Sequence, residues 1–192
     1  MWAVIATKVS ADAATRRCPP DPDVSRRKRV ARRGAAGDPV SMNSISVDTR
    51  FGRLGLEEDD GAIVKVIWDG ADAGAVTPLL AEAAAQMRAY DAGKLEDFDL
   101  PLRVGGSDLQ KDVCAAMCAI PFGYTRTYGE IARDLGVPAQ AVGQACGGNP
   151  IPVIIPCHRV MGAKGLTGFS GKGGVETKVA LLRHEGAAGL LI

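Results

Sequence analysis

The chain has 192 residues, of which 46% are hydrophobic, so it is long enough for one large or two small domains with buried cores. It has no run of about eighteen apolar residues, and Lys8 interrupts its apolar start before a signal-peptide core is complete. The net charge of +1 excludes a strongly basic protein that binds nucleic acid through charge alone. We therefore expect a cytoplasmic protein that does not interact with a membrane.

Residues 1–43 form a basic segment without hydrophobic periodicity. Residues 1–45 hold nine Lys and Arg against four Asp, and six of the basic residues lie within residues 26–33. Such a cluster is typical of nucleic-acid contacts or of a targeting address. Because Ala, Arg, Pro and Asp dominate, we favour a disordered tail or a wrongly assigned start, since Met42 directly precedes the first strand pattern.

Residues 44–101 have the pattern of a small α/β domain. Apolar residues alternate between residues 44 and 56, and a third apolar run covers residues 63–68 after the turn sequence Asp59-Asp60-Gly61. A helix follows, with Thr77 as its N-cap, Pro78 as its first residue and Gly93 at its end. Its helical spacing places Leu80, Ala84 and Met87 on the sheet, and residues 94–104 are expected to link this domain to the next.

Residues 102–189 are predicted to form a mainly helical second domain. A helix is expected near residues 108–119, and the sequence Thr127-Tyr128-Gly129-Glu130 is a capping box that begins a helix ending at Gly136. Pro138 opens a further helix over residues 139–147. Two short helices with so tight a turn form a helix-turn-helix, which inserts its second helix into DNA or serves only for packing.

The second helix of this pair has small residues where a reader of the major groove usually carries Arg, Asn or Gln. Its small residues favour the minor groove and recognition of DNA by shape. They are Ala139, Ala141, Gly143, Ala145 and Gly147, with Gly148 directly after the helix.

The tetrapeptide Pro156-Cys157-His158-Arg159 follows the apolar run 151–155, which we expect to be a strand. A neighbouring base or cation favours the thiolate form of a cysteine, and the chain has only two histidines. A single Cys-His pair is, however, more often an inert buried pair than a catalytic one. The five cysteines, at positions 18, 114, 118, 146 and 157, follow neither a disulfide nor a zinc spacing, so we expect reduced thiols and no metal.

The motif does not stand alone. Asn149-Pro150 precedes the apolar run, Gly168-Phe169-Ser170-Gly171 follows the tetrapeptide, and Leu181-Leu182-Arg183-His184-Glu185-Gly186 closes the region. From about Ser44 to Gly186 the chain resembles the O6-alkylguanine-DNA alkyltransferases. The resemblance implies an α+β fold, in which a ribonuclease H-like N-terminal domain precedes a winged-helix-like domain with a helix-turn-helix.

The resemblance also assigns catalytic roles. Cys157 matches the alkyl acceptor, His158 the base that acts through a water, and Glu185 the carboxylate that orients this histidine. Asn149 matches a hinge residue, and Tyr128 matches the tyrosine that donates a hydrogen bond to the flipped base.

Other residues are implied in binding. Ser170 matches a pocket serine near O6, and Arg159 is expected to brace the active-site loop. The remaining candidates for contact with DNA or the flipped base are Thr127, Gln140, Ala141, Gly143, Ala145 and Phe169. Gln140 departs from the family pattern, because an arginine usually fills the gap that the flipped nucleotide leaves, so we expect slower repair of duplex DNA.

The expected function is single-turnover transfer of an alkyl group, typically methyl, from O6-alkylguanine in DNA to Cys157. The partner would be double-stranded DNA with this lesion, with O4-alkylthymine as a second candidate lesion. We expect a monomer without cofactor or obligate protein partner. Two alternatives stay open: a lesion-binding protein with little or no transfer, and a Cys-His hydrolase or thiol transferase, for which no oxyanion-hole pattern is visible.

Overall fold

The computed structural model describes residues 42–163, 165–166 and 168–187. The predicted basic tail lies outside these residues except for its last two positions, and the two final residues of the predicted second domain lie outside them as well. The described part is a mixed α/β structure with a small sheet and five α-helices. None of these helices has both the length and the apolar composition that crossing a membrane requires.

Three antiparallel strands form the sheet in the order β1-β2-β3. They are β1 (Asn43–Thr49), β2 (Gly52–Asp59) and β3 (Ala62–Trp68). Val47 pairs with Leu54, and Leu56 with Val66, so that these four apolar side chains share the buried face. The predicted turn is confirmed: Gly61 joins β2 to β3 with a φ of 72°, which glycine adopts without strain.

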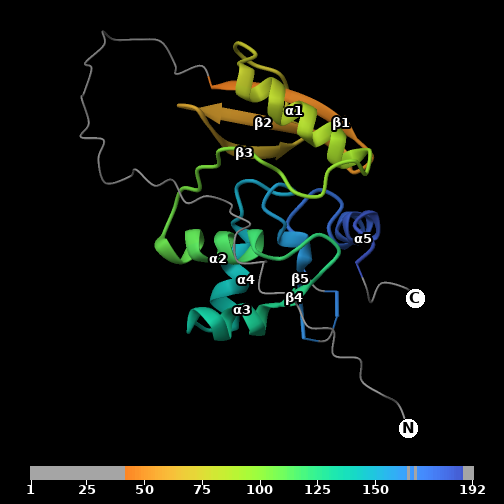
Figure 1. Ribbon diagram of the computed structural model, residues 1–192. Helices are drawn as coiled ribbons and strands as arrows, with labels where there is room; N and C mark the ends of the chain where they lie inside the picture. The colour runs from red at the N-terminus through yellow and green to blue at the C-terminus, as the bar shows by residue number, and fades with distance from the viewer. Residues whose placement is uncertain (1–41, 164, 167, 188–192) are drawn as a thin grey trace, which may run out of the picture.

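Helix α1 (Pro78–Asp91) lies across this sheet (Figure 1). The Thr77 side chain accepts a hydrogen bond from Leu80 N at 3.1 Å, which confirms the predicted N-cap. Leu80, Ala84 and Met87 are fully buried, as their spacing predicts. Tyr90 is fully buried as well, so the apolar side of the helix continues through its last turn.

The other helices lie beyond β3, below the sheet in Figure 1. They are α2 (Asp108–Cys118), α3 (Tyr128–Leu135), α4 (Ala139–Gly147) and α5 (Val175–His184). Both halves of the predicted capping box are present at the start of α3. Gly136 ends α3 in the left-handed conformation, and the three residues 136–138 connect α3 to α4, against which it packs.

The expected linker 94–104 is partly bound to the sheet. Ile63 N donates to Pro101 O at 2.8 Å, and Arg103 N donates to Ile63 O at 3.0 Å. This segment therefore runs beside β3 before the chain enters α2. A second connection is Val66 N, which donates to Pro150 O at 2.9 Å and so ties β3 to the segment that leads to Cys157.

The prediction of a strand over residues 151–155 is wrong. Ile155 N donates to Ile151 O at 2.8 Å, and Val153 has a φ of 74°, so this segment is a tight buried turn. Pro150, Pro152 and Pro156 lack the N–H groups that an internal strand must supply. The turn leads into a short 3-10 helix, η2 (Cys157–Arg159). After it, β5 (Val160–Met161) pairs in parallel with β4 (Arg126–Thr127).

Candidate active site

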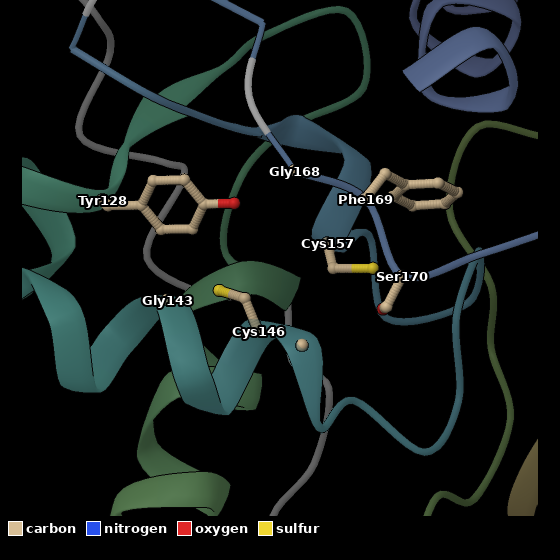
Figure 2. A pocket seen from close by; sticks show the side chains of 8 residues that line it. Tyr128, Gly143, Cys146, Cys157, Gly168, Phe169 and Ser170 are labelled. Carbon is tan, nitrogen blue, oxygen red and sulfur yellow. The ribbon is translucent and has the colours of Figure 1, made fainter. Parts of the chain in front are cut away.

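A cavity of about 320 Å³ opens beside Cys157, the first residue of η2. Its walls come from α3, α4, η2 and the segment before α5 (Figure 2). They consist of Tyr128, Gly143, Cys146, Gly147, Cys157, Gly168, Phe169 and Ser170. The Cys157 thiol thus faces a partly open cavity whose other walls come from three further elements.

The surroundings of Cys157 act on its ionisation in opposite directions. Burial raises the pKa of the thiol, because a thiolate loses solvation in an apolar environment. A hydrogen bond from Asn149, the charge of Lys178 and the backbone N–H groups of Cys157 and His158 oppose this rise. The resting group is therefore a thiol, and several donors are already in place for the thiolate.

The His158 side chain is fully buried, and its Nε2 lies 2.7 Å from Glu185 Oε1. Because a carboxylate only accepts hydrogen bonds, Nε2 carries the proton and Nδ1 keeps its lone pair. This Nδ1 is buried and has no hydrogen-bond partner among the described residues. Burial lowers the pKa of His158 more than Glu185 raises it. His158 is therefore a neutral imidazole with a basic nitrogen that is free to accept a proton.

Glu185 is the centre of a buried hydrogen-bond network. Besides His158, its carboxylate accepts from Tyr90 Oη at 2.7 Å and from Arg159 Nε and Nη2 at 2.8 and 2.9 Å. Burial raises the pKa of Glu185, but the hydrogen bonds and charges of His158 and Arg159 outweigh it and lower the pKa to about 2. Glu185 is thus a firmly ionised carboxylate at the end of α5.

Asn149 and Arg159 fix the chain before and after Cys157. Arg159 Nη1 donates to Ile120 O at 2.6 Å, and its guanidinium lies 5.7 Å from the centre of the Phe122 ring. Asn149 Nδ2 donates to Ile155 O at 2.8 Å, and Asn149 Oδ1 accepts from Ile151 N at 3.0 Å. The bracing position expected for Arg159 is present, and Asn149 closes the turn that precedes Cys157.

Two of the predicted pocket residues, Tyr128 and Ser170, line the cavity, as does Phe169 (Figure 2). Burial, together with the nearby thiols of Cys146 and Cys157, raises the pKa of Tyr128, so its hydroxyl stays protonated and able to donate. Thr127 is different. Its side chain is engaged in the capping box with Glu130 and does not line the cavity.

The candidates on α4 separate into two groups. Gln140 is exposed, Ala141 and Gly143 are half-buried, and Gly143 also lines the cavity. Ala145 is buried, and its carbonyl accepts from Gln110 Nε2 of α2 at 2.8 Å. The small-residue face predicted for α4 therefore does not include Ala145, which packs inside.

Sequence reasoning missed three residues of this site. Cys146 lies three positions after Gly143, so helical spacing alone would have placed it on the same wall. Tyr90 and Lys178 have no such local signal. Tyr90 reaches Glu185 from a helix 95 positions earlier in the chain, and only the folded structure brings them together.

A model of the 6-O-methylguanine DNA methyltransferase DNA-binding domain matches residues 108–187. A Methanosarcina barkeri protein named methylated-DNA–protein-cysteine methyltransferase is 53% identical over 107 residues, which cover 54% of this chain and 66% of that relative. This chain thus matches slightly less than two thirds of that relative's length. A Mycolicibacterium paratuberculosis protein of the same name is 43% identical over 156 residues, covering 79% of this chain and 83% of the relative.

The fold is also similar to solved structures. The crystal structure of Mycobacterium tuberculosis OGT in complex with DNA superposes with a TM-score of 0.66 and 41% sequence identity. The match covers 73% of this chain and 91% of that chain. The similarity therefore includes the sheet and α1 as well as the cavity and its helices.

Proposed function

The chain belongs to the methylated-DNA–protein-cysteine methyltransferase family, and from this premise we propose that it repairs DNA by moving a methyl or other alkyl group from guanine O6 to its own Cys157. One observation carries the proposal: the Cys157 thiol lines the cavity, and the next residue in the chain, His158, is a neutral imidazole hydrogen-bonded to the ionised Glu185 carboxylate. A thiol is a weak nucleophile until it loses its proton. It therefore needs a base that accepts the proton and a carboxylate that orients this base.

Each step of the transfer has a group to perform it. The Cys157 proton passes through a water to Nδ1 of His158, and Glu185 stabilises the resulting imidazolium. The sulfur attacks the alkyl carbon, and the bond from that carbon to O6 breaks, leaving its electron pair on the guanine. The Tyr128 hydroxyl donates a hydrogen bond to the departing base. The product is a thioether, which water does not cleave, so each molecule acts once.

Double-stranded DNA is the proposed partner. Helices α3 and α4 would serve as the helix-turn-helix of a winged-helix-like domain, with the sheet and α1 as a ribonuclease H-like N-terminal domain over residues 44–101. Gly143, Cys146 and Gly147 of α4 form one wall of the cavity. DNA bound along α4 in its minor groove would therefore be positioned to deliver a flipped nucleotide into the cavity.

The test is the intact mass of the protein after incubation with a duplex that contains one O6-methylguanine. We expect a gain of one methyl group, mapped to Cys157 by peptide analysis and absent from Cys157→Ala. Selective binding of the lesion duplex without any mass change would instead assign the protein to the lesion-binding class. Hydrolysis of small acyl substrates in the absence of DNA would support a Cys-His hydrolase and refute the proposal.

A further inference from the structure

Lys178 is a fully buried lysine in the middle of α5. Burying an ammonium group is costly unless polar groups surround it. Its Nζ donates to Val160 O at 2.6 Å and to Gly168 O at 3.3 Å. Part of the cost of burial is thus offset by carbonyl groups at two separate points of the chain.

These two carbonyls belong to two different segments, one that follows Cys157 and one that lines the cavity. Val160 directly follows η2, and its N–H donates to Cys157 O. It is therefore bonded to η2, which carries the proposed nucleophile and is called the nucleophile segment below. Gly168 lines the cavity itself. The Lys178 ammonium therefore bridges the segment that carries the thiol and the segment that closes the space in front of it.

The same ammonium is close enough to act electrostatically on the thiol. Its positive charge favours the thiolate of Cys157 and, reciprocally, this thiolate favours the charged lysine. In a buried site with low effective dielectric, such an interaction is stronger than at the surface. Burial lowers the pKa of Lys178, and the thiols of Cys157 and Cys146 oppose that effect.

The other groups that face Cys157 come from three elements. His158 on η2 is neutral, and burial raises the pKa of both Cys146 on α4 and Tyr128 on α3, so these two stay uncharged. Arg159 forms an ion pair with Glu185. Among the described residues, Lys178 is thus the cation whose charge acts on the thiol.

We propose that Lys178 is a positioning residue of the alkyl transfer, which holds the nucleophile segment against the wall of the cavity and stabilises the Cys157 thiolate by its charge. This inference rests on the proposed function. Its electrostatic part can nevertheless be measured without DNA, because any small alkylating reagent reports on the ionisation of the thiol.

The experiment is the rate of Cys157 alkylation by iodoacetamide as a function of pH, followed by peptide mapping. Lys178→Gln retains a hydrogen-bond donor but removes the charge. We expect its profile to shift to higher pH, with a rate at neutral pH lowered roughly tenfold for each unit by which the thiol pKa rises. Methyl transfer from the lesion duplex should fall at neutral pH and recover as the pH is raised.

The control is Lys65→Gln, because Lys65 lies exposed on β3. Its pH profile should equal that of the unmodified protein. If Lys178→Gln does not fold, Lys178→Arg keeps the charge and should retain the original profile. An unshifted profile in Lys178→Gln, or a shifted one in Lys178→Arg, would overturn the inference. A protein that shows the alkylation shift but transfers no methyl group would instead refute the proposed function.

Discussion

At the scale of single residues, the site depends on one carboxylate that receives hydrogen bonds from three side chains. Glu185 fixes the proton of His158 on Nε2, binds Arg159 through two nitrogens and accepts from Tyr90. Each donor keeps the carboxylate ionised, and an ionised carboxylate keeps His158 in the tautomer that exposes Nδ1. Orientation of the base and stability of the buried charge therefore have a common origin.

Removing the Tyr90 hydroxyl tests this network. Tyr90→Phe deletes a buried hydrogen bond to a charged group, so we expect the free energy of unfolding to fall by about 2 kcal/mol. Urea unfolding at neutral pH measures the change. Tyr128→Phe is the matched control, since it deletes the hydroxyl of a cavity tyrosine. It should slow methyl transfer and leave stability nearly unchanged; equal stability losses in both variants would contradict this assignment.

Gln140 is exposed in the first turn of α4, and it is uncharged where the family pattern usually has arginine. Gln140→Arg should accelerate methyl transfer from duplex DNA by about tenfold, because one charge-assisted contact contributes roughly 1.5 kcal/mol. Single-turnover rates on duplex DNA and on the free modified base measure this effect. The rate on the free base should not change. An unchanged or lower rate on the duplex would refute the role given to this position.

At the scale of elements, α3 and the segment before α5 set the shape of the cavity. Tyr128 is the first residue of α3, so the start of this helix determines where the tyrosine side chain enters the cavity. The capping box of Thr127 and Glu130 fixes that start. The role of Thr127 is thus to position Tyr128, and the structure gives no direct contact of Thr127 with the cavity.

Loss of this cap should have a modest, measurable cost. Thr127→Ala removes the side-chain acceptor for Glu130 N, and we expect a loss of about 1 kcal/mol in unfolding free energy. Thermal unfolding followed by circular dichroism measures it. Thr127→Ser retains the hydroxyl group and should remain within a few tenths of a kcal/mol of the unmodified protein. A Thr127→Ser variant as unstable as Thr127→Ala would exclude the cap as the cause.

The wall formed by Phe169 is supported by the sheet. The ring centres of Phe169 and Trp68 lie 6.4 Å apart in an edge-to-face arrangement. A Cβ atom at Gly171 would collide with the Phe169 ring and would lie 2.9 Å from Trp68, so only glycine fits beneath these rings. The exposed Lys172 also contacts the end of β3, because its Nζ donates to Asp69 Oδ1 at 2.7 Å. The segment that closes the cavity is thereby attached to β3.

Trp68→Ala should loosen this wall. With the indole absent, the Phe169 ring can move outward, so we expect the rate for O6-benzylguanine to rise relative to that for O6-methylguanine. Loss of the half-buried indole should also cost about 2 kcal/mol of stability. Competition between the two substrates, read out by the mass of the Cys157 peptide, measures the ratio. Trp68→Phe keeps an aromatic ring and should keep the ratio of the two rates. An unchanged ratio in Trp68→Ala would show that Trp68 does not hold the Phe169 ring in place.

At the scale of the whole molecule, the sheet layer and the helical layer meet at the hydrogen-bond network around Glu185. His184 Nε2 donates to Tyr90 O at 2.7 Å, and its ring packs edge-on against Phe51, Tyr90 and Phe122. Together with Tyr90 and Glu185, these contacts join α1 to the end of α5. Stability of the two layers and integrity of the site are therefore coupled.

This coupling predicts a loss of stability in acid. The pKa of His158 is lowered from 6.5, so stability is complete above about pH 6.5 and declines as the pH falls below that value. The pKa of Glu185 is lowered from 4.5 to about 2, so its contribution is complete above about pH 4.5 and is lost as the pH falls towards 2. The two effects therefore act in the same direction, and both reduce stability as the pH falls.

Urea unfolding between pH 3 and pH 8, with about one pH unit between points, measures this dependence. Glu185→Gln cannot ionise at this position, so its stability should fall less steeply below about pH 4.5. Glu176→Gln is the control, because Glu176 lies exposed in the first turn of α5, and it should keep the original slope. Identical slopes in all three proteins would place the acid sensitivity elsewhere.

The sequence by itself determined most of the elements and the chemistry of the site. Turn and capping residues such as Thr77, Gly93, Thr127 and Gly136 act within a few positions of themselves, so their effect is visible in the sequence. The Cys157-His158 pair alone did not identify the proposed nucleophile; the motifs around it did, through their resemblance to the alkyltransferases. The apolar run 151–155 was misjudged, because its hydrophobicity is typical of a strand while its flanking prolines prevent pairing.

Only the tertiary structure decided which distant groups meet around Cys157 and Glu185. Tyr90 and Lys178 reach the site from α1 and α5. The sequence pattern of neither helix indicates this, because a local pattern does not show which distant residue a lysine or tyrosine contacts. Burial of Ala145 depends likewise on the packing of α2 against α4. Local sequence specifies backbone hydrogen bonds between near neighbours, whereas the environment of a buried charge depends on contacts across the whole chain.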